Sequence, residues 1–258
     1  MVSGFSAVDR AGHPERFEAY LDLTARGLAA MKHYIVAAHD VAGSELVLDI
    51  GCGTGHDLDL LADAHIPALG IDPSTQLLEA AQRRLQVGRP GAPLLRAAGE
   101  AIPLRDACVG GCRIERVLQH VADPALVLSE AVRCLRPGGL LTVFEPDWSS
   151  LRITSDAFDS DASWLVRVKQ PEIGRALWEL VERAGCDVVD RVEELSVWSS
   201  LDLAERLISV TAGLKRQVDR GLMSTEDAAA RLAEQEDRDR DGRFRATTVK
   251  VLVCARKV

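Results

Sequence analysis

A short glycine-rich segment between a strand and a helix constrains the fold of this 258-residue chain most strongly. Residues 46–50 are almost entirely apolar without alternation, which is typical of a parallel strand buried on both faces. Three glycines follow at alternate positions, Gly51, Gly53 and Gly55, and a helix is expected over residues 57–64. Glycine is needed where the backbone takes positive φ or closely approaches a ligand. Since doubly wound sheets bind nucleotides at the end of the first strand, the pattern favours a ligand-binding loop over a plain turn.

Strands and helices continue to alternate after this loop. Further strands are expected over residues 68–71, 94–97, 112–114 and 140–145, and helices over residues 74–87 and 124–135. Ser74 is an expected N-cap, and Asp123 with Pro124 is typical of a helix start. Repeated strand–helix units predict an α/β, doubly wound and mostly parallel sheet with right-handed crossovers.

The two ends of the chain differ from this repeating part. One amphipathic helix is predicted over residues 15–42, closed by Gly43. The second half is expected to contain a helix over residues 172–184, a strand over 188–197, helices over 201–214 and 225–239, and a closing strand over 244–255. The pair of helices between the last two strands reads as an insertion.

The composition restricts the partners and the compartment. Asp and Glu number 39 against 31 Lys and Arg, a net charge of −8 that repels phosphate backbones, so no nucleic-acid partner is expected. No apolar segment is long enough to cross a bilayer and residues 1–10 do not form a signal peptide, so we expect a cytoplasmic protein without membrane insertion. The six cysteines form no CxxC pair, and no metal site is expected.

The second strand ends in an acidic residue, Asp72, about 20 residues beyond the glycine loop. Both hydroxyls of a ribose can donate to one carboxylate, so Asp72 indicates an adenosine cofactor. Helix capping is the alternative, because Pro73 and Ser74 begin the next helix. The glycine spacing is G-x-G-x-G, whereas dinucleotide-binding folds use G-x-G-x-x-G.

Five segments, in order, resemble the motifs of class I S-adenosylmethionine-dependent methyltransferases. The loop segment VLDIGCGTG is similar to the first motif, and GIDPS to the second. The five segments are residues 47–55, 70–74, 99–104, 117–124 and 135–141. Together they place the chain near the small-molecule branch, the relatives of ubiquinone-biosynthesis methyltransferases.

The resemblance implies a seven-stranded, Rossmann-like methyltransferase fold with S-adenosylmethionine as its cofactor. We expect a single methyltransferase domain over residues 1–258. Its expected parts are an N-terminal helical cap (1–43), a cofactor-binding core (44–148), and a C-terminal half (149–258) with a helical lid insertion at about 201–240.

The resemblance also implies which residues bind the cofactor. They are Tyr20, Asp49, Gly51, Cys52, Gly53, Gly55, Asp72, Pro73, Ser74, Ala98, Gly99, Glu100 and Arg116. Two positions depart from the family pattern. Ala98 replaces an Asp that commonly receives the adenine amino group, and Gly110 stands where the family often carries Phe-Asp before the fourth strand. Backbone groups near Gly99, or Glu100, would then recognise the adenine.

Methyl transfer from a sulfonium requires a positioned nucleophile, and a base only where the acceptor must lose a proton. His120 and Asp147 are the candidate catalytic bases, since both follow strands whose ends face the cofactor. The simpler interpretations are a turn-capping His120 and an exposed strand end at Asp147. Glu115 with Arg116 could equally form a buried ion pair.

We therefore expect an enzyme that transfers a methyl group from S-adenosylmethionine to a small, partly apolar metabolite by in-line displacement. The expected partner is a small-molecule substrate, and a homodimer is a possible assembly of the chain. Two alternatives stay open: a cofactor-binding protein without methyl transfer, such as a cyclase or accessory subunit, and a nicotinamide-dependent oxidoreductase.

Overall fold

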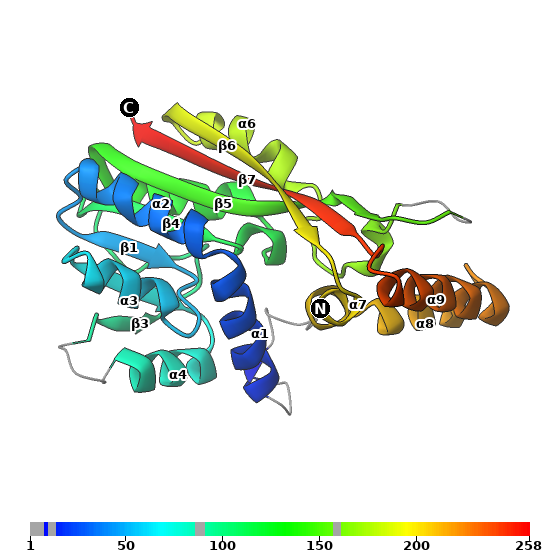
Figure 1. Ribbon diagram of the computed structural model, residues 1–258. Helices are drawn as coiled ribbons and strands as arrows, with labels where there is room; N and C mark the ends of the chain where they lie inside the picture. The colour runs from blue at the N-terminus through cyan, green and yellow to red at the C-terminus, as the bar shows by residue number, and fades with distance from the viewer. Residues whose placement is uncertain (1–7, 10–13, 86–90, 157–160) are drawn as a thin grey trace.

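A seven-stranded sheet is the centre of the computed structural model, which describes residues 8–9, 14–85, 91–156 and 161–258 (Figure 1). The strands are β1 (Val47–Ile50), β2 (Ala68–Asp72), β3 (Leu94–Arg96), β4 (Val109–Glu115), β5 (Leu135–Ile153), β6 (Cys186–Trp198) and β7 (Ala246–Lys257). Their order is β3-β2-β1-β4-β5-β7-β6, with β1 to β5 parallel and β7 antiparallel to both of its neighbours. The predicted doubly wound, mostly parallel sheet is confirmed.

Helices cover both faces of this sheet. They are α1 (Pro14–Gly27), α2 (Ala29–Val41), α3 (His56–Asp63), α4 (Thr75–Leu85), α5 (Pro124–Cys134) and α6 (Ile173–Arg183). On one face α5 and α6 bury Leu128 and Leu177 against the strands. On the other face α2 and α3 bury Ile35 and Leu58. Asp123 caps α5 by accepting a hydrogen bond from Leu126 N, as its sequence predicts.

The N-terminal segment forms two helices, so the prediction of one continuous helix was wrong. α1 ends at Gly27 and α2 begins at Ala29. The break lets the two helices face different surfaces: Met31 and Ile35 of α2 pack on the sheet, whereas Tyr20 of α1 lies beyond the area that α2 covers.

The fourth strand is longer than the predicted 112–114, because Gly110 and Gly111 belong to β4. A Cβ atom on Gly111 would lie 2.6 Å from Nδ1 of His39, which α2 buries over the sheet. Glycine is thus required at this position by the close approach of the helix. The departure noted at Gly110 therefore lies inside a strand instead of preceding it.

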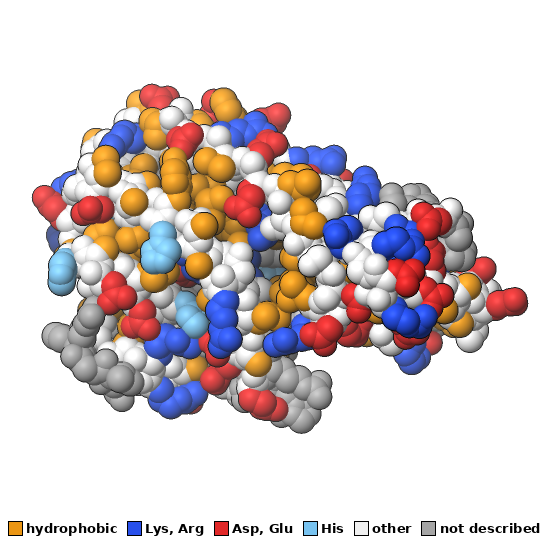
Figure 2. Space-filling view, in the orientation of Figure 1, with side chains coloured by type: hydrophobic (Ala, Val, Ile, Leu, Met, Phe, Trp, Pro, Cys, Tyr) orange, Lys and Arg blue, Asp and Glu red, His pale blue; other side chains and the backbone are white. Residues whose placement is uncertain are grey.

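Beyond the ends of its shorter parallel strands, the sheet extends into a second packed unit, here called the helical lobe. It contains η3 (Ser163–Leu165), α7 (Leu201–Ile208), α8 (Val210–Asp219) and α9 (Thr225–Arg240), packed on the far ends of β5, β6 and β7 (Figure 1). Its apolar cluster includes Trp148, Leu165 and Phe244. Charged side chains of both signs crowd its surface (Figure 2).

Two predicted element boundaries near the helical lobe were wrong. β5 does not end at Glu145 but continues to Ile153, with an irregular register between Asp147 and Arg152. The helix predicted over 201–214 is interrupted at Ser209, whose φ is +53°. Among the helices that the structure describes, none is long and apolar enough to cross a membrane.

Candidate active site

The three glycines of the loop all adopt positive φ, at +74° for Gly51, +53° for Gly53 and +78° for Gly55. Only glycine takes this conformation without strain. At Gly51 a Cβ atom would also lie 2.3 Å from Cγ2 of Val117. The loop therefore needs glycine both for its conformation and for the close approach of the segment that follows β4.

A cavity of about 280 Å³ opens at this loop, and we call it the loop cavity. Its walls come from the loop, the end of β2, the segment after β3, the segment after β4, and helix α1. Among the predicted cofactor residues, those that line it are Tyr20, Gly51, Gly53, Asp72, Pro73, Ala98, Glu100 and Arg116.

The other predicted cofactor residues are, among those the structure describes, not part of this lining. Asp49 is buried in an ion pair with Arg113, and burial raises the pKa of the Cys52 thiol. Gly55 is the N-cap of α3, and the Ser74 hydroxyl donates to Asp9. These positions, together with Gly99 packed against Val127, support the lining from behind.

Asp72 both supports the glycine loop and faces the loop cavity. Its carboxylate accepts hydrogen bonds from Gly53 N at 3.0 Å and from Ser74 N at 2.8 Å, and it also lines the loop cavity. Burial raises the pKa of Asp72 to about 6. Each oxygen keeps acceptor capacity beyond its one backbone bond, so the carboxylate can both shape the loop and receive a ligand hydroxyl.

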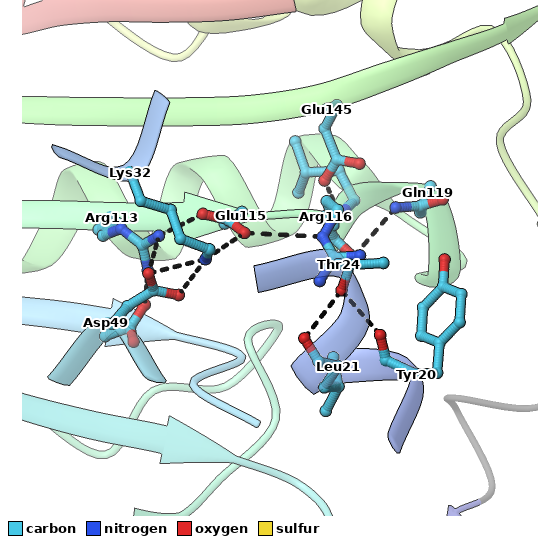
Figure 3. Close-up of polar contacts among 12 residues, drawn as sticks. Tyr20, Leu21, Thr24, Lys32, Asp49, Arg113, Glu115, Arg116, Gln119 and Glu145 are labelled. Carbon is cyan, nitrogen blue, oxygen red and sulfur yellow. Dashed lines mark hydrogen bonds and ion pairs between the residues drawn. The ribbon is translucent and has the colours of Figure 1, made fainter. Parts of the chain in front are cut away.

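A buried network of charges lies behind the loop cavity (Figure 3). Lys32 of α2 donates to Asp57 at 2.8 Å and to Glu115 at 2.6 Å. Arg113 pairs with Asp49 at 3.0 Å and with Asp57 at 2.8 Å, and also contacts Glu115. Burial raises the pKa of Asp49 to about 6, whereas for Asp57 the charges of Arg113 and Lys32 outweigh burial and lower the pKa.

Arg116 connects this network to the cavity. Its φ of +56° is unusual for a side chain other than glycine, and its backbone N donates to Phe144 O at 2.8 Å. The guanidinium lies 5.9 Å from the centre of the Tyr20 ring and 3.6 Å from Glu115. The atom nearest to Glu115 is the buried Nε, which faces the carboxylate just beyond hydrogen-bond distance and makes no hydrogen bond within the described chain. A buried donor of this kind fits a ligand carboxylate.

A second cavity, of about 530 Å³, lies over the sheet beyond α2, and we call it the sheet cavity. Phe144, Trp148 and Trp198 contribute apolar walls, and Leu203 and Leu207 of α7 close it toward the helical lobe. Tyr20 and Arg116 line both cavities. The two cavities therefore meet at this pair of side chains.

The two predicted bases, His120 and Asp147, lie in different positions relative to the two cavities. His120 lines the loop cavity, where burial, with smaller contributions from Arg116 and Lys169, lowers the pKa of its imidazole to about 3. Among the described residues, Asp147 lines neither cavity; its carboxylate accepts from Ser149 N and Oγ and lies 3.5 Å from Arg175. The suggestion that Asp147 faces the substrate is thus not supported by its position, because the pleat of β5 turns it to the opposite face.

Several lining residues were not identified from the sequence. Lys169 lines the loop cavity, and Thr248 and Lys250 line the sheet cavity. Alternation along β7 could have placed Thr248 and Lys250 on one face. Only the insertion of β7 between β5 and β6 brings that face to the sheet cavity.

Comparison with known proteins agrees with this geometry. Residues 48–143 match a family described as a methyltransferase domain. A Streptomyces fradiae protein named only as an uncharacterized 37.1 kDa transposon protein is 36% identical over 80% of this chain and 62% of its own length. A Mycolicibacterium smegmatis protein named as a probable S-adenosylmethionine-dependent methyltransferase is 35% identical over 65% of this chain and 60% of its own. The chain spans about half to three fifths of the length of such curated relatives.

Solved structures share the fold. A Bacillus halodurans protein provisionally assigned as a methyltransferase superposes with a TM-score of 0.57 at 20% identity, over 86% of this chain and 98% of that one. The [4+2]-cyclase SpnF superposes with a TM-score of 0.50 at 20% identity, over 86% of this chain and 81% of that one.

The family match identifies a methyltransferase domain over residues 48–143, within a fold that the solved structures share. Within the described ranges, no group of three or more His, Cys, Asp or Glu side chains is placed to hold a metal ion.

Proposed function

We propose that this protein transfers the methyl group of S-adenosylmethionine to a small, partly apolar metabolite. The observation that carries the proposal is the meeting of the loop cavity and the sheet cavity at Tyr20 and Arg116. One cavity has the loop and carboxylate expected at a cofactor site. The other has an apolar lining suited to an acceptor.

The cofactor supplies an activated methyl group on a sulfonium, and the protein supplies binding and orientation. Asp72 would accept the ribose hydroxyls. Arg116, which lines the loop cavity, would hold the carboxylate of the methionine part. Ala98 and Glu100 line the side of the loop cavity where adenine would lie, so Glu100 or nearby backbone would recognise it.

The acceptor would lie in the sheet cavity, against Phe144, Trp148 and Trp198. These side chains exclude water and orient the acceptor, which is the main requirement of an in-line displacement. His120 is a poor proton acceptor at neutral pH because the pKa of its imidazole is about 3. We therefore attribute the rate to positioning more than to a base on this chain.

The resemblance to relatives of ubiquinone-biosynthesis methyltransferases supports a metabolite over a macromolecule as acceptor. The net charge of −8 agrees with it. A cytoplasmic location fits the six free cysteines of the chain.

The test combines cofactor binding with label transfer. The purified protein should bind S-adenosylhomocysteine by calorimetry, and with methyl-labelled S-adenosylmethionine it should move label into the organic-solvent fraction of a metabolite extract. Binding without transfer would favour a cofactor-binding protein such as a cyclase or accessory subunit. Binding of a nicotinamide cofactor in place of S-adenosylhomocysteine would contradict the proposal.

A further inference from the structure

Lys250 is a cation on the sheet cavity wall that the proposed reaction does not use. It belongs to β7, where its register partners are Pro146 on β5 and Glu194 on β6. Its side chain is half-buried and lines the sheet cavity together with Thr248, two residues earlier on the same strand face. The surrounding wall includes Trp148 and Trp198.

The structure gives this ammonium group no direct anionic partner: in the described part of the chain no hydrogen bond or ion pair is made by Lys250 Nζ. Its nearest charged neighbours on the packed elements are Glu194 and Glu115, which favour its charge, and Arg116, which opposes it. Glu115 already binds Lys32 and contacts Arg113. Glu194 is exposed to solvent, where its charge is screened.

The described lining of the sheet cavity carries an excess of positive charge. Its cations are Arg26, Arg116 and Lys250, and its one carboxylate is that of Glu194. Burial lowers the pKa of Lys250, which means that its charged form is held at a cost in free energy. An anion beside it would remove that cost.

The mouth of the same cavity is apolar. Leu195 and Val197 of β6 line it while 61% and 53% of their surfaces are exposed. Leu203 and Leu207 extend the apolar lining toward the helical lobe. A ligand bound here would lie against these apolar side chains and would meet the charged groups of Arg26, Arg116, Glu194 and Lys250 in the same lining.

From this arrangement we infer that the sheet cavity selects apolar molecules that carry an anionic oxygen, a carboxylate or an ionised hydroxyl, and that Lys250 binds that oxygen. The inference rests on the proposed function, since it narrows the acceptor class of the same site. It makes Lys250 a specificity-determining residue, with the apolar body of the ligand against Trp148 and Trp198.

The experiment uses the full chain saturated with S-adenosylhomocysteine and two ligands of nearly equal size. One is 2-naphthoate, an apolar anion, and the other is 2-naphthamide, its neutral counterpart. Calorimetry should show tighter binding of the naphthoate by the parent protein. Lys250→Met should lower the affinity for naphthoate about tenfold or more, which is the usual loss for a charged hydrogen bond. Its affinity for naphthamide should stay within about twofold of the parent's.

Two further variants complete the design. Lys250→Arg should retain the preference for the anion, and Lys215→Met, which removes an exposed lysine of α8, should behave as the parent does. Added salt should weaken the preference in the parent, in Lys250→Arg and in Lys215→Met, whereas Lys250→Met should show no such salt dependence. Unchanged affinity of Lys250→Met for S-adenosylhomocysteine shows that the variant is folded.

Equal binding of acid and amide by the parent, or detectable binding of neither, would overturn the inference. So would an equal loss of both ligands in Lys250→Met. Failure of the protein to bind S-adenosylhomocysteine would instead refute the proposed function, so the two failures are distinguishable.

Discussion

At the scale of single residues, the carboxylate of Asp72 is the most informative group, because it holds the glycine loop and faces the loop cavity at once. Asp72→Asn should lower the affinity for S-adenosylhomocysteine by about tenfold to a hundredfold, because a charge-assisted hydrogen bond is lost. Calorimetry measures this loss, with the exposed Asp40→Asn of α2 as the matched control. An Asp72→Asn protein that binds as tightly as the parent would remove Asp72 from the site.

The same carboxylate predicts a pH dependence. Burial raises the pKa of Asp72 to about 6, so protonation on acidification removes the better acceptor. Affinity of the parent for S-adenosylhomocysteine should therefore decrease as the pH falls through about 6, and Asp72→Asn should not share that decrease. A parallel pH profile for both proteins would assign the titration to another group.

Glu145 predicts a pH dependence in the opposite direction, and this one concerns the stability of the fold instead of ligand binding. It is fully buried, accepts a hydrogen bond from Leu118 N at 2.6 Å, and has its pKa raised by burial to about 8. The folded state therefore retains a proton that the unfolded state loses above about 4.5, and stability should fall as the pH rises from about 4.5 to 8.

The variant Glu145→Gln isolates this contribution. Glutamine keeps the acceptor and adds a donor at the position of the unsatisfied Oε2. In thermal and denaturant unfolding, the free energy of unfolding of Glu145→Gln relative to the parent should increase by on the order of a few kcal/mol from pH 5 to pH 8. Exposed Glu236→Gln is the control. A constant difference between Glu145→Gln and parent across this range would show that Glu145 is ionised in the folded protein.

At the scale of elements, Lys32 links helix α2 to the strands beneath the loop cavity. Lys32→Met would leave the buried carboxylates of Asp57 and Glu115 short of one cation. Loss of a buried partner costs about 3–5 kcal/mol, so the free energy of unfolding should decrease by that order. Lys215→Met on exposed α8 should change it by less than about 0.5 kcal/mol. Equal effects of the two substitutions would contradict a structural role for the network.

We also propose that the helical lobe and α1 act together as a lid over the two cavities. Tyr20 and Leu23 of α1 pack against the lobe cluster, and α1 contacts α7. Hydrogen exchange should slow in α1 and α7 when S-adenosylhomocysteine binds, while α6 on the opposite face should not change. Unchanged protection in α1 and α7 would leave the lobe as a rigid wall.

Elements with strong local signals were predictable, and those set by tertiary contacts were not. Consecutive apolar residues in 46–50 and the cap at Asp123 are local, and both were placed correctly. The break after Gly27 and the left-handed Ser209 depend on which surface each helix covers. The start of β4 at Gly110 and Gly111 was misplaced, because the reason for glycine at Gly111 is the overlying His39 of α2. The sequence carries no local record of such contacts.

The residues of the candidate site were likewise predictable where the signal is local and not where tertiary contacts decide their position. Gly51, Gly53 and Asp72 follow directly from the loop and strand pattern, and they line the loop cavity. Asp147 was taken for a cavity residue, although the pleat of β5 directs it away. Lys250 was not found at all, because its position depends on β7 pairing beside β5.

At the scale of the whole molecule, the topology explains why two cavities lie side by side. The parallel strands end at the glycine loop, while β5, β6 and β7 continue past them to the helical lobe. α1 spans the space between these two parts (Figure 1). The molecule thus places a polar, loop-lined cavity next to an apolar one, with Tyr20 and Arg116 between them.

A crystal structure with S-adenosylhomocysteine tests this central claim most directly. The account predicts ribose hydroxyls within hydrogen-bond distance of Asp72, about 3 Å, and a sulfur facing the opening between Tyr20 and Arg116 toward the sheet cavity. A cofactor in the sheet cavity, or a sulfur directed away from it, would contradict the account.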